Sequence, residues 1–161
     1  MLFDYTDRGT GSIENLESMN TGAYEGEASI VYVYLMLYQQ SWKNEYLDYA
    51  KKHAVILRQL LEKDEHYDLL SGNAGAAWIL LKLYDTAGDN KYLEMAERAV
   101  GVLIEKDELQ ERGIGWRIEE GTAPMAGIAH GNSGILMPII ILWARTKKRK
   151  IQGISRRSME V

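Results

Sequence analysis

Two kinds of hydrophobic pattern alternate along this chain. From Glu27 to about Gln39, apolar residues occupy nearly all sides of the predicted helix, which is typical of a helix surrounded by protein. From Asn44 to Leu61, apolar residues instead recur at spacings of three and four with charged residues between them, as in an amphipathic helix with one face in water. The sequence therefore predicts a buried inner helix followed by an amphipathic outer helix.

This pair of patterns is repeated in a register of 46 residues, as from Gly26 to Gly72. The second inner segment, residues 76–84, is rich in strong helix formers. It favours a helix over the strand that the β-branched residues and tyrosines of the first copy also allow. The second outer segment runs from Asn90 to Ile104. Self-similarity at this period is typical of stacked helix pairs, because one pair cannot bury its own apolar face.

A third glycine-rich turn, between Gly131 and Gly134, precedes a third inner helix that the pattern predicts over residues 135–144. Pro138 lies within this segment, where it would kink the backbone or mark a displaced helix start. After Ala144 the repeat fails, so no third outer helix is expected. The predicted fold is all-α and consists of about two and a half helical hairpins.

The connections between helices carry two further expectations. Asn44 and Asn90 (or Asp89) stand where a side chain that caps a helix N-terminus is wanted. After Glu105 the pattern predicts a loop of about 25 residues without regular structure, and loops of that length are usually functional or inserted.

Charge divides the chain unevenly. Residues 145–161 hold seven of the 19 basic side chains and one of the 23 acidic ones. A patch for nucleic acid or an anionic membrane is one interpretation, but no aromatic residues are interleaved for bases to stack on, which favours a solvated tail. We therefore expect an irregular lead-in over residues 1–21, a helical domain over 22–144 and a basic tail over 145–161, without a nucleic-acid partner.

The composition excludes several classes of site. The chain has no cysteine, which excludes disulfides, a thiol nucleophile and zinc sites built on thiolates. No segment reaches the roughly 18 apolar residues of a membrane span, and the amino terminus lacks the basic and apolar regions of a secretory signal. A cytoplasmic protein is the expectation. Among the three histidines, His53 and His66 are predicted at the surface, and His130 has the chemistry for proton transfer near neutral pH.

Four sequence motifs occur in a familiar order: residues 22–26, residues 67–75, Gly113-Ile-Gly-Trp-Arg117, and residues 124–135 with the central His130-Gly-Asn-Ser-Gly134. Over about residues 20–145 they resemble the cyclase module of lanthionine synthetases, the LanC-like family. The likeness is greatest to the class II bifunctional enzymes (LanM). A single glycine box would be weak evidence, whereas three in register with these contexts are more specific.

The resemblance implies a partial α/α toroid, with about two and a half of the family's seven inner and outer helix pairs. Family members add a cysteine thiol of a precursor peptide to dehydroalanine or dehydrobutyrine, in lanthipeptide (lantibiotic) biosynthesis. A zinc ion held by two cysteines and a histidine activates the thiolate. By this resemblance His130 matches an active-site histidine that is not a zinc ligand, and Asp68 matches an active-site aspartate. The zinc-ligand boxes are absent here, so the resemblance predicts a truncated module, without zinc and inactive alone.

Two other classes of function remain open from the residues alone. A non-catalytic helical-repeat module would bind a peptide or a partner protein, and exposed helix faces would favour homo-oligomers. A glycosidase-like hydrolase on the same toroid would need paired carboxylates on the loops before inner helices, for which Glu25 and Asp68 are the candidates.

Overall fold

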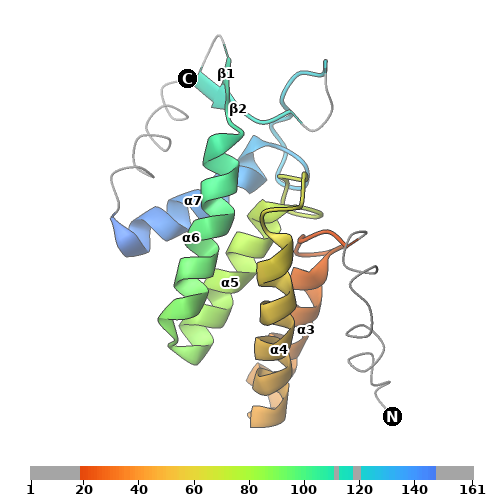
Figure 1. The fold of residues 1–161 in the computed structure, drawn as a ribbon, viewed down its shortest axis with the longest axis vertical. Helices are drawn as coiled ribbons and strands as arrows, with labels where there is room; N and C mark the ends of the chain where they lie inside the picture. Colours follow the sequence, from red (N-terminus) through yellow and green to blue (C-terminus); the bar gives the residue numbers. More distant parts are fainter. Residues whose placement is uncertain (1–18, 111–112, 118–120, 148–161) are drawn as a thin grey trace.

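The computed structural model describes residues 19–110, 113–117 and 121–147. Within these ranges the chain forms a helical body with a short two-stranded sheet at one end (Figure 1). The elements in chain order are α3 (Glu27–Ser41), α4 (Asn44–Leu60), α5 (Asn73–Ala87), α6 (Asn90–Glu105), β1 (Glu108–Gln110), β2 (Gly113–Gly115) and α7 (Asn132–Thr146).

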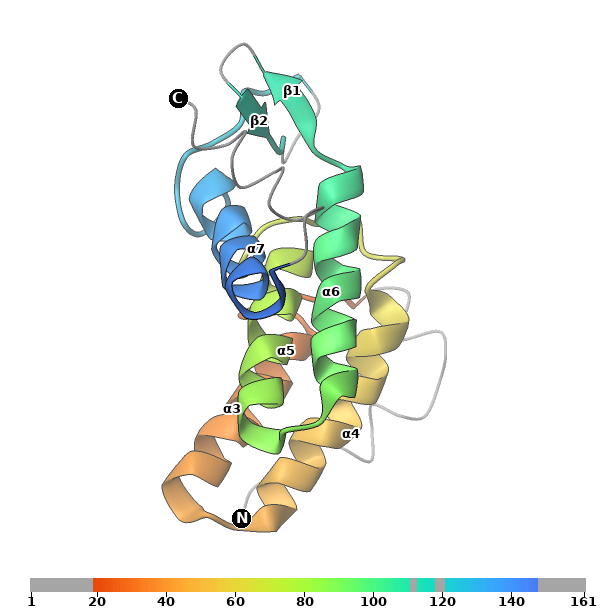
Figure 2. The ribbon, with the colours of Figure 1, turned by 90° about the vertical axis from the view of Figure 1, so that its left-hand side faces the viewer.

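The helices pair as the repeat predicts. α3 packs on α4 and α5 packs on α6, while α5 also contacts α3 on one side and α7 on the other. Seen from the side, α4 and α6 lie together and cover one side of the inner helices (Figure 2). The all-α fold class, with inner and outer helices in alternation, is confirmed.

The burial of each helix follows its sequence pattern. The central helix α5 is enclosed on nearly all sides, and its buried residues are Asn73, Ala74, Gly75, Ala76, Ala77, Ile79, Leu80, Leu81 and Leu83. The outer helix α6 buries one face, which consists of Tyr92, Met95, Ala96, Ala99, Val100 and Leu103. The first inner helix α3 differs, because Val33 and Met36 on it remain 55% and 41% exposed.

The helix starts only partly match the predicted caps. Asp89 is the N-cap of α6, and its Oδ1 accepts a hydrogen bond of 3.0 Å from the backbone N–H of Lys91. Hydrogen bonds from Lys91 hold the pKa of the Asp89 carboxyl below its usual value. The expectation for Asn44 is wrong, because Asn44 is the first residue of α4 and Lys43, without a capping side chain, precedes it.

The long segment after Glu105 is not the structureless loop that the pattern predicts. It contains an antiparallel hairpin in which Leu109 pairs with Ile114. Trp116, which follows the second strand, is fully buried, and its indole N–H donates to the carbonyl of Leu103 at 2.7 Å. Each strand has three residues, which is too short for a period of two to be visible in the sequence.

The third inner helix is longer than predicted at both ends, since α7 begins at Asn132 and ends at Thr146. It runs through the buried Pro138, so this proline does not mark a displaced start. The predicted lead-in up to residue 18, and the tail beyond residue 147 where a third outer helix would stand, lie outside the described residues. In the described part of the chain, no helix has both the length and the apolar character that a membrane crossing requires.

Candidate functional site

Three glycine-rich loops lie side by side at the N-terminal ends of α3, α5 and α7. The middle loop accepts hydrogen bonds from the first, from Gly22 N–H to the Ser71 carbonyl at 2.9 Å and from Tyr24 N–H to the Leu70 carbonyl at 3.0 Å. It donates to the third loop, from Leu69 N–H to the Ala129 carbonyl at 3.2 Å. Backbone hydrogen bonds therefore join the three loops into one continuous edge at the N-terminal ends of the inner helices.

The glycines of these loops permit a very close approach between backbones. A Cβ atom added to Gly75 would overlap the carbonyl oxygen of Leu69 and the backbone nitrogen of Ala23. A Cβ on the equivalent Gly134 of α7 would overlap the carbonyl oxygen of Ile128. Glycine at this position of α5 and α7 is thus required by packing between loop and helix, while the equivalent residue of α3 is Ser29.

The structure brings Asp68 and His130 together from two neighbouring loops. Asp68 Oδ2 lies 2.8 Å from His130 Nδ1. The Asp68 side chain is only 5% exposed, whereas that of His130 is 45% exposed. Because an ionised carboxylate can only accept, Nδ1 carries the hydrogen, and Nε2 of a neutral His130 is then a free base on the far side of the ring.

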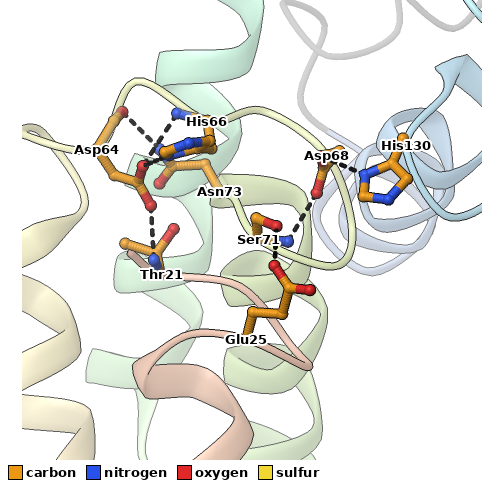
Figure 3. A network of polar contacts seen from close by, with 8 residues as sticks. All are labelled: Thr21, Glu25, Asp64, His66, Asp68, Ser71, Asn73 and His130. Carbon is orange, nitrogen blue, oxygen red and sulfur yellow. Dashed lines mark hydrogen bonds and ion pairs between the residues drawn. The ribbon is translucent and has the colours of Figure 1, made fainter. Parts of the chain in front are cut away.

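The other oxygen of Asp68 is held by its own loop. Asp68 Oδ1 accepts a hydrogen bond of 2.7 Å from the backbone N–H of Ser71. The hydroxyl of Ser71 in turn donates to Glu25 Oε2 at 2.8 Å. Figure 3 shows Glu25, Ser71, Asp68 and His130 as one line of polar contacts across the three loops. Glu25 and Asp68, the carboxylates that sequence reasoning paired, are thus joined through Ser71.

A second group of polar contacts anchors the start of the middle loop. Asp64 accepts hydrogen bonds from the backbone N–H groups of Thr21 and His66 and lies 2.7 Å from the Nδ1 atom of His66. The Asp64 side chain is 2% exposed and that of His66 is 58% exposed. His66 is therefore at the surface, as the sequence predicts. The hydrogen bonds of Asp64 fix the start of the middle loop four residues before Asp68.

The surface position predicted for His53 is wrong. His53 lies on α4 and is buried, and its Nδ1 is 2.6 Å from the Oε1 atom of Glu27 in the first turn of α3. The ring also stacks on Tyr34, with 5.7 Å between the ring centroids. The charged residues around His53 in the sequence face water, while His53 itself faces α3 and joins the two helices of the first hairpin.

The register of the repeat also shows a relation that sequence reasoning missed. Glu25, Ser71 and His130 each directly precede the first glycine of their box, so they occupy equivalent positions of the three loops. Ser71 carries no catalytic signature in the sequence, because a serine before a glycine is common in turns. Its link to Asp68 depends on its backbone N–H, which a sequence does not display.

The chain's donor set does not fit the zinc site that the resemblance implies. The sequence has no cysteine, and in the described ranges no group of three or more histidine, aspartate or glutamate side chains could hold a metal ion. A cleft of about 920 Å³ lies beside the site and is lined by Tyr67, Lys63, Lys106 and other residues. Asp68 and His130 do not line this cleft, although Tyr67, which does, directly precedes Asp68.

The comparison with protein families agrees with the order of the glycine boxes. A family model described as lanthionine synthetase C-like protein matches residues 3–161, which is nearly the whole chain. No curated protein matches the chain.

Proposed function

Because the chain belongs to the lanthionine synthetase C-like family, we propose that Asp68 and His130 form the proton-transfer site of a thioether-forming cyclase. The substrate is a precursor peptide that contains cysteine and dehydroalanine or dehydrobutyrine. We further propose that the chain corresponds to part of the cyclase domain of a class II (LanM) synthetase of lantibiotic biosynthesis, and that it is cytoplasmic. The contact between Asp68 Oδ2 and His130 Nδ1, at 2.8 Å with the ring half exposed, is the observation that carries this proposal.

The chemistry needs one base and one acid, and a single histidine supplies both in turn. Nε2 of His130 takes the proton of the peptide thiol as the sulfur forms its bond to Cβ of the dehydroamino acid. The π-electron pair of the double bond moves to Cα and its carbonyl, giving an enolate. The same Nε2 then returns the proton to Cα, so the thiol adds across the double bond without another reagent. Asp68 keeps Nδ1 protonated and orients the ring.

Thiol activation is the part of this reaction that the chain's residues do not supply. In the family zinc lowers the thiol pKa, but this chain has no cysteine to form that site. Without such activation, a peptide thiol with a pKa near 8.5 is mostly protonated at neutral pH. We therefore propose that the chain alone is inactive compared with a zinc-activated relative. Any slow protein-dependent ring closure is measured in long incubations at neutral pH, where the peptide thiol still carries the proton that His130 takes.

His130→Ala should abolish the protein-dependent part of ring closure. We expect a rate at least about 100-fold lower, because a positioned acid-base group contributes about 10²- to 10⁴-fold. The new stereocentre at Cα should also change from one diastereomer to a mixture, since solvent protonates both faces of the enolate. The measurement is the rate and diastereomer ratio of thioether formation in a synthetic dehydrobutyrine–cysteine peptide, by liquid chromatography and mass spectrometry.

The matched control is His66→Ala, since this histidine is exposed and pairs with Asp64 instead of Asp68. It should keep both the rate and the stereochemistry of the wild-type protein. If His130→Ala and the wild-type protein give the same diastereomer ratio and the same rate, His130 is not the proton donor and the proposal fails.

A non-catalytic binding module is the second candidate, and one observation favours it. The inner helix α3 leaves Val33 and Met36 exposed, whereas the middle inner helix α5 is covered by α3 on one side and by α7 on the other. Two copies of the chain that meet through this face would cover both side chains. We expect the weight-average mass in sedimentation equilibrium to rise toward that of a dimer with concentration, and Met36→Lys to suppress that rise. A monomer at all concentrations would contradict self-association.

A further inference from the structure

The polar line through the three loops gives Glu25 and Ser71 a role that the family match does not assign. Glu25, Ser71 and His130 occupy the same position of successive repeats, and Asp68 joins the second of them to the third. In Figure 3 the side chains of Glu25 and Ser71 point toward one another on the side of Asp68 that is opposite His130. The equivalent positions of the repeat thus meet at one site.

Asp68 can orient His130 only while its carboxylate is itself held. Of its two oxygens, Oδ2 faces His130, and Oδ1 is held by the backbone N–H of Ser71 at 2.7 Å. The position of the Ser71 backbone therefore determines how Asp68 is held. Ser71 is buried, with 8% of its surface exposed, and its hydroxyl donates to Glu25 Oε2 at 2.8 Å.

The carboxylate of Glu25 also determines where the Ser71 hydroxyl donates. A serine hydroxyl has one hydrogen to give, and it readily bonds to polar groups nearby in its own loop. Without the bond to Glu25, Ser71 is held only by its backbone hydrogen bonds, and the direction of its N–H toward Asp68 Oδ1 is less well fixed. The exposed Glu25 lies in the first loop, so its contact is made across the repeat and is not needed to form the middle loop itself.

We infer that Glu25 and Ser71 are positioning residues for the Asp68–His130 pair, acting through the hydrogen bond from the Ser71 hydroxyl to Glu25. The expected effect on ring closure rests on the proposed function. The expected effect on the tautomer of the His130 ring does not depend on that function. In the wild-type protein neutral His130 is held with its hydrogen on Nδ1. Without Glu25 the ring exchanges between its two tautomers.

The test is ¹⁵N NMR of the His130 ring in the full chain, which reports the hydrogen on each ring nitrogen. The variants are Glu25→Ala, Ser71→Ala and Glu25→Gln. Glu25→Ala and Ser71→Ala should both move the Nδ1 and Nε2 shifts toward the average of the two tautomers. Glu25→Gln, whose amide oxygen still accepts the hydroxyl hydrogen, should keep the wild-type shifts. The control Glu94→Ala removes an exposed carboxylate of α6 and should change nothing.

Ring closure provides a second readout. Glu25→Ala and Ser71→Ala should each lower the maximal rate about 10-fold with KM unchanged, as for residues that orient an active-site histidine. Their double variant should be no slower than either single variant, because both remove the same hydrogen bond.

Wild-type ring shifts in Glu25→Ala would overturn the inference, as would additive losses in the double variant. The two proposals fail separately. If His130→Ala leaves ring closure intact while Glu25→Ala still shifts the tautomer, the proposed function is wrong and the positioning role stands.

Discussion

Gly75→Ala should destabilise the protein by about 3 kcal/mol, the upper part of the usual range for overpacking a core. The added methyl group would overlap the carbonyl oxygen of Leu69 and the backbone nitrogen of Ala23, which belong to two different loops. Neither atom is the end of a flexible side chain, so two backbone segments have to move. The measurement is the free energy of unfolding from urea denaturation followed by circular dichroism.

Gly101→Ala is the matched control for this substitution. Gly101 lies within α6, and a Cβ atom there meets nothing within 4 Å. Alanine is the better helix former, so this variant should be about 1 kcal/mol more stable than the wild-type protein. Equal free energies of unfolding for the two variants would contradict the close approach of the loops to α5. Gly75→Ala should also weaken the contact between Asp68 and His130, since Leu69 directly follows Asp68 in the displaced loop.

His53→Ala should cost about 3 kcal/mol of stability, because it leaves the carboxylate of Glu27 buried without its partner. Glu27 is 1% exposed, and its Oε1 lies 2.6 Å from His53 Nδ1. The variant also loses the stacking of His53 on Tyr34. Urea denaturation of the variant and the wild-type protein measures the difference.

The second hairpin of the repeat offers a compensating change. At the positions equivalent to Glu27 and His53 it carries Asn73 and Ala99, both fully buried. Adding Glu27→Asn to His53→Ala removes the buried charge and should recover part of the lost stability. His66→Ala removes an exposed ring, and Asp64 keeps its hydrogen bonds from the backbone N–H groups of Thr21 and His66, so stability should change by less than about 1 kcal/mol. If His53→Ala costs no more than His66→Ala, the pair does not hold α3 to α4.

Helices α3 to α6 could be predicted closely because their patterns depend on local sequence. The alternation of all-round and one-sided apolar patterns reflects how much of each helix the rest of the protein covers, so burial is written into the sequence. The repeat then identifies the two hairpins without any structure. The hairpin of β1 and β2 was not predicted because strands of three residues are too short to show a period of two. Trp116, which follows β2, holds the hairpin against α6 through its hydrogen bond to Leu103.

The candidate site was predictable only in part. Resemblance named Asp68 and His130, but 62 residues separate them, and nothing in the pattern predicts that one accepts a hydrogen bond from the other. His53 shows the opposite error, because a histidine among charged residues on an outer helix is typical of the surface. Its burial follows from the rotation of α4 against α3, which places it opposite Glu27.

The sequence by itself therefore determined the helical hairpins, their register and the glycines at which backbones approach. These features depend on periodicity and on residue size, which are properties of the chain. Only the tertiary structure decided that three loops form one edge and that Glu25, Ser71 and His130 meet there through Asp68. Hydrogen bonds between loops depend on distance and direction in space, because neighbouring repeats place equivalent residues next to each other only when the inner helices are stacked.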